Sequence, residues 1–198
     1  MSTPAIKSQP VYAELEWDRA GTHHILFVAA EDAALAQRLL SNPPAGTITL
    51  IHLGSTSAEA RSCWSQGLPD SALYLETHSL AEALEVLRDA LYVAQMGTRI
   101  YLAGPEDAVW QASRVADGFG VGRDEVRYAQ LGSKARPVFC VHCRTITRGV
   151  HTNIVSCSGC GRSLFVRDHF SRRLGAYMGF QIDAEVPGEV PAAEVVYP

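Results

Sequence analysis

Short apolar runs alternate with amphipathic stretches between Thr22 and Gln130, which is the pattern of a parallel sheet covered by helices. Strands are predicted at the apolar runs 23–30, 47–54, 72–77, 99–105 and 125–132. Helices are predicted at 31–40, at 58–65, from Ser79 to Ala94, and after Pro105. The pattern therefore predicts an α/β domain with five parallel strands and helices on both faces. The run 11–17 is a candidate extra edge strand.

The clearest helix begins at Ser79, with Glu82 three residues later. This spacing is a capping box, in which each side chain satisfies an amide that the helix leaves without a partner. Apolar residues recur after it at steps of three and four, which puts them in one stripe against the sheet. They are Leu80, Ala83, Leu84, Leu87, Leu91 and Ala94.

The charge changes sign twice along the 198 residues. Residues 1–133 carry 9 Lys/Arg and 16 Asp/Glu, residues 134–174 carry 8 and 1, and residues 175–198 carry 0 and 4. We therefore expect an α/β domain at 1–133, a basic module at 134–182 and an acidic, Pro-rich tail at 183–198. The tail is expected to be extended, and ordered only along a partner.

Composition and cysteine usage restrict the class of protein. No apolar run approaches the roughly 18 residues of a membrane span, and the first residues lack a secretory signal. Four of the five cysteines form two C-x-x-C pairs, unlike a disulfide framework, which indicates a reducing cytoplasm. Cys63, outside the pairs, is expected to be a small core residue. We expect a cytoplasmic protein without membrane contacts.

The basic module contains CVHC, thirteen further residues and then CSGC. Each C-x-x-C turn points two thiolates at one ion, and two such turns complete a tetrahedral site. The sequence therefore predicts a metal site at Cys140, Cys143, Cys157 and Cys160. Structural zinc is the preferred ion, and iron is the alternative, because rubredoxin-like sites use the same turns. With four protein ligands, no position is left open for catalysis.

Arginines and aromatic residues interleave after the second C-x-x-C pair. This composition is typical of the core of a protein interface, although a solvated basic face over local core aromatics gives the same pattern. The predicted interface residues are Arg162, Arg167, Phe170, Arg172, Arg173 and Tyr177, and Phe165 and Phe180 belong to the same stretch.

The stretch RIYLAGPEDAVWQASRVADGFGVGRDEVRYAQLG resembles the end of the NAD-binding domain of ferredoxin reductase-type oxygenase reductases. Their Cys-Gly-Pro turn is Ala103, Gly104 and Pro105 here. Where those reductases have a glycine-rich phosphate turn, this chain has Ala29 to Asp32, whose two carboxylates disfavour a pyrophosphate. This argues against NAD(P) binding. The cluster Ser55, Thr56, Ser57 and Arg61 fits either ribose contacts or a helix cap.

The segment ARPVFCVHCRTITRGVHTNIVSCSGCGRSLFVRDHFSRRLGAYMGFQIDAE resembles the small DmmA-type subunit of bacterial dimethylamine monooxygenase. The resemblance implies a part in the NADPH- and oxygen-dependent conversion of dimethylamine to methylamine and formaldehyde. It also implies partner subunits that carry flavin and iron-sulfur groups and a haem-type oxygenase centre.

The residues themselves offer no pairing of a nucleophile with a base, so we expect no catalytic residues and an accessory role. Two alternatives stay open. One is a zinc-ribbon protein that binds nucleic acid through the same arginines, which the acidic remainder of the chain disfavours. The other is a free-standing NAD(P)-binding oxidoreductase component.

Overall fold

The computed structural model describes residues 8–54 and 58–198, which form two compact units. Residues 12–132 form the first, here called the α/β unit. The second, the cysteine module, contains residues 133–198 together with residues 8–11. Ser8 joins this module through a bridge to His169, with its amide donating to the carbonyl of Asp168 at 3.3 Å.

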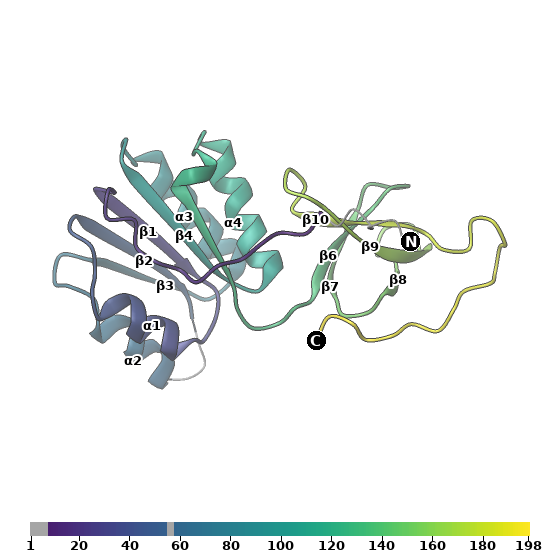
Figure 1. Cartoon of the computed structure of the whole chain (residues 1–198), viewed down its shortest axis with the longest axis horizontal. Coiled ribbons are helices and arrows are strands. Elements are labelled where there is room, and N and C mark those ends of the chain that lie inside the picture. The colour runs from purple at the N-terminus through teal and green to yellow at the C-terminus, as the bar shows by residue number, and fades with distance from the viewer. Residues whose placement is uncertain (1–7, 55–57) are drawn as a thin grey trace, which may run out of the picture. The chain divides into compact units, whose positions relative to one another are not determined.

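A five-stranded parallel sheet forms the centre of the α/β unit, as the apolar runs predict (Figure 1). Its strand order is β3-β2-β1-β4-β5, so the order reverses between β1 and β4. The strands are β1 (His23–Val28), β2 (Thr47–Leu53), β3 (Leu73–Thr77), β4 (Thr98–Gly104) and β5 (Val126–Gln130).

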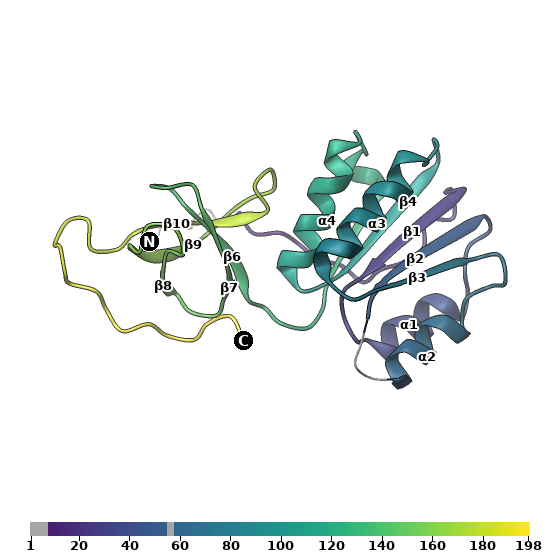
Figure 2. The same ribbon diagram turned by 180° about the vertical axis from the view of Figure 1, so that it is seen from behind.

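Helices cover both faces of this sheet, with α1 and α2 on one face and α3 and α4 on the other (Figure 1; Figure 2). Alternate residues of β1 serve the two faces: Leu26 packs with the α1 side, and Ile25 and Phe27 pack with the α3 and α4 side. The helices are α1 (Ala33–Leu40), α2 (Ala58–Gln66), α3 (Leu80–Tyr92) and α4 (Glu106–Gly118), with a short 3-10 turn, η1 (Arg123–Glu125), before β5.

The predicted start of α3 is present, with one difference in its capping. The Ser79 hydroxyl accepts a hydrogen bond from the amide of Glu82 at 3.1 Å. The Glu82 carboxylate accepts from the amide of His78 at 2.8 Å, one residue before the cap. Ala83, Leu87 and Leu91 are buried along the predicted stripe.

The segment 11–17 forms no strand, contrary to the candidate edge strand of the sequence analysis. It is held by side chains instead of by a ladder of backbone hydrogen bonds. Leu15 is buried in the core, and the indole of Trp17 donates to the carbonyl of Leu39 at 2.8 Å. The candidate strand is therefore wrong for this segment, whose anchors are two large side chains.

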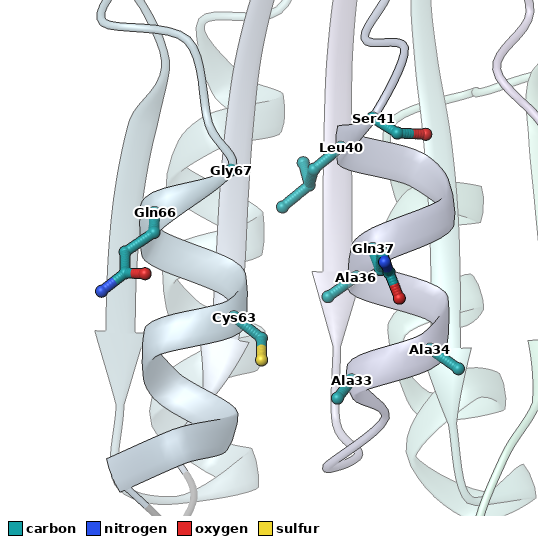
Figure 3. A pocket seen from close by; sticks show the side chains of 9 residues that line it. All are labelled: Ala33, Ala34, Ala36, Gln37, Leu40, Ser41, Cys63, Gln66 and Gly67. Carbon is teal, nitrogen blue, oxygen red and sulfur yellow. The ribbon is translucent and has the colours of Figure 1, made fainter.

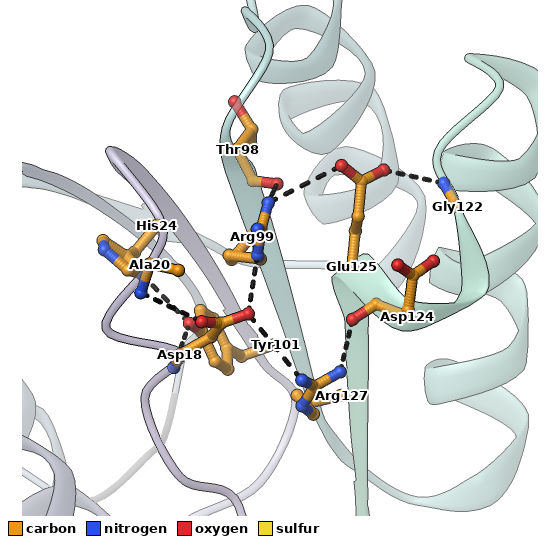
Figure 4. Close-up of polar contacts among 10 residues, drawn as sticks. All are labelled: Asp18, Ala20, His24, Thr98, Arg99, Tyr101, Gly122, Asp124, Glu125 and Arg127. Atoms are coloured by element: carbon orange, nitrogen blue, oxygen red, sulfur yellow. Dashed lines mark hydrogen bonds and ion pairs between the residues drawn. The ribbon is translucent and has the colours of Figure 1, made fainter.

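A polar network fastens the next residues to the amino-terminal ends of β1 and β4 (Figure 4). Asp18 accepts from the guanidinium of Arg99 at 2.7 Å, and its amide donates to the hydroxyl of Tyr101 at 2.9 Å. His24 lies 3.0 Å from the same hydroxyl. Hydrogen bonding to Arg99 lowers the pKa of Asp18, so the carboxylate stays charged in the network.

The cysteine module is a second five-stranded sheet of order β7-β6-β10-β9-β8. β10 pairs with β6 in parallel, and the other neighbours are antiparallel. Buried side chains such as Val138, Leu164 and Tyr177 form its small core. The strands are β6 (Arg136–Cys140), β7 (Ile146–Val150), β8 (Ile154–Ser156), β9 (Ser163–Ser171) and β10 (Ala176–Gln181).

The tail returns to this module at its end. The amides of Val196 and Tyr197 donate to the carbonyl of His151, and the amide of Lys134 donates to the carbonyl of Pro198 at 2.7 Å. The guanidinium of Arg136 lies 3.8 Å from the ring centroid of Tyr197. The tail turns at residues 183–188 and is extended after them, and its last residues contact the chain's own module.

In the described ranges, no helix is both long and apolar enough to cross a membrane.

Candidate metal centre

Each C-x-x-C pair lies in a turn between two antiparallel strands. Cys140 ends β6 and the first turn leads into β7, while Cys157 follows β8 and the second turn leads into β9. The same two backbone hydrogen bonds close each turn. The amide of the first cysteine donates to the carbonyl five residues later, which belongs to Thr145 in the first turn and Arg162 in the second. The carbonyl of the first cysteine accepts from the amide of the residue four positions later.

The residue at that fourth position has a positive φ in both turns. It is Arg144, with φ 64°, in the first turn and Gly161, with φ 72°, in the second. Glycine adopts this conformation freely, whereas arginine does so at a cost. The two knuckles therefore share one backbone conformation, and the first keeps it despite the less suitable residue.

The four sulfur atoms converge, all lying within 4.8 Å of one another. The Sγ atoms of Cys140 and Cys160 are 3.8 Å apart, and those of Cys143 and Cys157 are 3.5 Å apart. A tetrahedral site with metal–sulfur bonds of about 2.3 Å has sulfur–sulfur edges of about 3.8 Å. The four thiols are free, not paired in disulfides. Their arrangement fits one metal ion.

The surroundings of the thiols differ. Hydrogen bonding to Thr145 lowers the pKa of the exposed Cys143 to about 6, so this sulfur is ionised at neutral pH. Burial raises the pKa of Cys140 to about 11. A bound cation offsets the cost of ionising the buried thiol, because thiolates are the ligands that metals take. The donor set is therefore suited to a cation that stabilises all four thiolates.

Gly159 lets the second knuckle approach the first closely. A Cβ atom at this position would lie 2.4 Å from the hydroxyl oxygen of Thr145 and 3.1 Å from the Sγ of Cys143. With four cysteines present, no ligand position is left for water or a substrate. Within 8–54 and 58–198, these cysteines are the single group of three or more potential ligands so arranged.

The carboxyl edge of the parallel sheet is where ligands bind in nucleotide-type folds, at the point where strand order reverses. Here the amino terminus of α1 holds its own carboxylate, because Asp32 accepts from the amide of Leu35 at 2.8 Å. The amino terminus of α4 carries the buried Glu106, which accepts from the hydroxyl of Tyr12 at 2.6 Å. Carboxyl side chains thus already occupy both helix termini that would attract a phosphate.

A cavity of about 530 Å³ lies at this edge. Glu14, Asp32 and Arg38 contribute its charges, and Arg38 is paired with Glu14 at 3.0 Å. Further along the crevice, a Cβ on Gly104 would come within 2.9 Å of the Ala29 side chain. Close strands and carboxyl side chains thus lie along the edge where dinucleotides bind in such folds. Residues 55–57 and the Arg61 side chain, the other candidate nucleotide contacts, lie outside the described part.

A second cavity, of about 560 Å³, separates α1 from α2 (Figure 3). Small and apolar side chains such as Ala33, Ala36 and Leu40 form much of its wall. Cys63 lines it and is exposed, so the expectation that this cysteine is a core residue is wrong. On α2, Trp64 occupies the core position instead.

The structure separates the predicted interface residues into two groups. The four arginines are exposed, on β9, before it, or in the turn between β9 and β10: Arg162, Arg167, Arg172 and Arg173. Phe170 and Tyr177 are instead buried, with ring centroids 4.9 Å apart. They form core of the module and present no surface to a partner, because β9 and β10 turn these positions inward.

Sequence reasoning missed Arg136, which the structure places at the centre of the module's polar contacts. Its guanidinium is 3.9 Å from the ring centroid of Tyr177 and 3.8 Å from that of Tyr197. It also pairs with Asp168 at 2.8 Å. The sequence did not indicate the contact of Arg136 with Tyr197, because this contact forms only when residues 194–198 return to the module.

A nucleotide-type parallel sheet followed by a four-cysteine knuckle defines a two-domain protein whose carboxyl-terminal module could hold a metal ion. Residues 4–126 match the family described as "Dimethylamine monooxygenase subunit DmmA-like, N-terminal domain", and residues 137–180 match the corresponding C-terminal domain. The chain therefore belongs to the DmmA-like family.

A curated relative is the "Heme-dependent oxidative N-demethylase delta subunit" of Ectopseudomonas mendocina (strain ymp). It is 39% identical over 109 residues, which are 55% of this chain and 62% of the relative. Similar solved structures include a phthalate dioxygenase reductase, with 13% identity, TM-score 0.39 and coverage of 68% of this chain and 46% of that one. A ferredoxin-NADP+ reductase from Plasmodium falciparum has 11% identity, TM-score 0.38 and coverage of 57% and 52%.

Proposed function

We propose that this chain is an accessory subunit of a multicomponent, oxygen-dependent N-demethylase that oxidises dimethylamine to methylamine and formaldehyde with NADPH. Family membership and the delta-subunit relative support this assignment. The chain carries out no bond-making step itself. Partner subunits carry the flavin, iron-sulfur and haem-type centres, and this subunit supports assembly and electron transfer among them in the cytoplasm.

The observation that carries this proposal is the combination of a closed metal site with a ligand edge that repels phosphate. Four cysteines saturate the metal, so the ion stabilises the module and activates no water. Asp32 and Glu106 occupy the helix termini where a nucleotide would bind. The function that is left for such a chain is binding to other proteins. The metal is zinc, held by the four cysteines, because a closed site without redox function suits it.

The proposed contact surface is the row of exposed arginines on the cysteine module. Arg167 stands over the ring of Phe180, with 5.8 Å between its Cζ atom and the ring centroid. Arg162 donates to the side chain of Gln181 at 3.1 Å. These contacts hold long side chains in place, which reduces the entropy lost when a carboxylate partner binds. We therefore propose an acidic protein surface as the partner of this module.

Reconstitution from purified subunits tests the proposal. Formaldehyde formation coupled to NADPH oxidation is measured with and without this chain, at matched concentrations of the other subunits. We expect coupled turnover to fall at least tenfold when the chain is omitted. Full turnover without it would refute the accessory role.

Charge reversal tests the docking surface. The double variant Arg167→Glu and Arg173→Glu should weaken binding to the partner at low salt, and the wild-type affinity should fall as salt rises. Arg38→Glu on α1 is the matched control, because its ion pair with Glu14 is on the surface and contributes little. Equal affinities for the double variant and the control would exclude this surface.

A further inference from the structure

One end of the α/β unit exposes an unusual share of large apolar side chains. Among its described side chains, five large apolar residues are exposed, and four of them lie where α3 and α4 end. They are Tyr92 (82% exposed), Val93 (71%), Met96 (97%) and Phe119 (41%), whereas the fifth, Leu73, lies at the start of β3. Single exposed apolar residues are ordinary, but a cluster marks a binding surface. This cluster is here called the apolar end.

A shallow cavity of about 220 Å³ joins the two helix ends. Met96 from the α3 side and Phe119 from the α4 side both line it, with Ala94 and Val121 beside them. Tyr92 and Val93 directly precede Ala94 in the chain. Met96 and Phe119 therefore border one hollow, which Gln95, Thr98 and Glu125 also line. Tyr92 and Val93 lie beside it in the chain, at the end of α3.

The backbone of the apolar end is fixed before any partner binds. The amide of Ala94 donates to the carbonyl of Leu91, and the amide of Thr98 donates to that of Gln95 at 3.1 Å. On the other side, the amides of Phe119 and Val121 both donate to the carbonyl of Ala116. Exposed side chains on a preformed backbone bind at a smaller cost in entropy than a mobile loop.

The charges around the apolar end are mainly acidic. Residues 12–132 carry 8 Lys/Arg against 16 Asp/Glu, so the whole unit is negative. Arg88, one turn before Tyr92, is ion-paired with Glu85. The sequence segments around the two helix ends contain Asp89, Asp117, Asp124 and Glu125, with Arg114 and Arg123. Of these carboxylates, Glu125 is ion-paired with Arg99 at 3.6 Å.

We propose that the apolar end is the docking surface for a second protein partner, whose contact face is apolar and rimmed by Lys and Arg. Charge complementarity selects this partner, because a basic rim meets the acidic surround while apolar side chains fill the hollow. The surface is opposite in sign to the arginine row of the cysteine module, which selects an acidic partner. The chain is thus an adapter that binds two different proteins, one through each unit. The adapter role rests on the proposed function, but the docking surface does not.

Binding of the full-length chain to each purified partner subunit of the demethylase tests this inference, using calorimetric titration. The double variant Tyr92→Ser and Met96→Ser should lose at least tenfold in affinity for one subunit and keep its affinity for the other. Leu73→Ser is the control, since it removes another exposed apolar side chain (53% exposed) elsewhere on the same unit. The thermal midpoint of tryptophan fluorescence, unchanged in all variants, verifies that they fold.

Three results would overturn the inference. The first is unchanged affinity of the Tyr92/Met96 variant for every subunit. The second is loss of affinity for the same subunit that the arginine variant loses, which would leave one partner instead of two. The third is a wild-type homodimer that dissociates in the Tyr92/Met96 variant, which would identify a second copy of this chain as the occupant of the apolar end. If the chain proves dispensable for turnover while the variant still loses affinity for one subunit, the proposed function fails and the docking surface stands.

Discussion

Removal of the metal should unfold the cysteine module and leave the α/β unit folded. A strong chelator applied to the full-length chain is one perturbation, and Cys157→Ser, which removes a buried ligand, is the other. Cys63→Ser is the matched control, because this exposed cysteine lies outside the metal site. We expect the chelated protein and the Cys157 variant to behave alike, and the Cys63 variant to behave as wild type.

The magnitude follows from the small core of the module. Among the described side chains, apart from cysteine and alanine, seven large apolar ones are buried in the module, against twenty in the α/β unit. Structural zinc in small domains contributes about 10–16 kcal/mol of apparent binding free energy. Whole domains are stable by only about 5–15 kcal/mol. Loss of the metal thus removes about as much free energy as the whole stability of a domain. Burial of seven side chains cannot compensate for that loss.

Two probes separate the units. All three tryptophans, Trp17, Trp64 and Trp110, lie in the α/β unit, so their fluorescence reports its unfolding alone. Cleavage by trypsin reports unfolding of the module, because cleavage sites such as Arg148 and Arg167 lie on its strands. After chelation we expect rapid cleavage between residues 140 and 175 and an unchanged fluorescence midpoint. Resistance to trypsin in protein shown to be metal-free would refute the reasoning.

Three further predictions follow from individual contacts. Gly159→Ala should lower metal affinity in a chelator competition, because its Cβ would collide with Thr145, and an unchanged affinity would contradict the close approach. Burial lowers the pKa of His52 in the fold, so the folded state binds fewer protons than the unfolded state, and the urea midpoint of tryptophan fluorescence should fall as pH drops below about 6.5. His52→Gln should reduce that fall, and an equal fall in both proteins would exclude His52. Deleting residues 197 and 198 uncovers Arg136 and should destabilise the module by about 1–2 kcal/mol, measured as faster trypsin cleavage.

The sequence predicted those features that depend on local spacing. The five apolar runs became the five parallel strands, because a strand buried on both faces is apolar at nearly every position. The C-x-x-C pairs brought four sulfurs together, because each pair is confined to one turn. Ser79 capped α3 as its position indicated. In each case the signal lies within a few residues of the structure that it specifies.

Contacts between distant residues were not predictable in this way. Tyr12 reaches Glu106, and Arg136 lies against Tyr197, over sequence separations that no periodicity encodes. Phe170 and Tyr177 were expected at the surface because arginines surround them in sequence. Strand alternation, which puts neighbours on opposite faces, explains why Arg167 points outward and Phe170 inward on β9, while the other three arginines lie outside the strands.

The hydrogen bond between Lys134 and Pro198 puts the entry of the cysteine module beside its exit. A segment whose two ends meet can be spliced into a surface loop of an unrelated host without stretching either junction. Residues 133–198, which lack only the contacts of residues 8–11, are therefore suited to transplantation as a cassette, whereas a fusion appended after Pro198 would emerge beside Lys134.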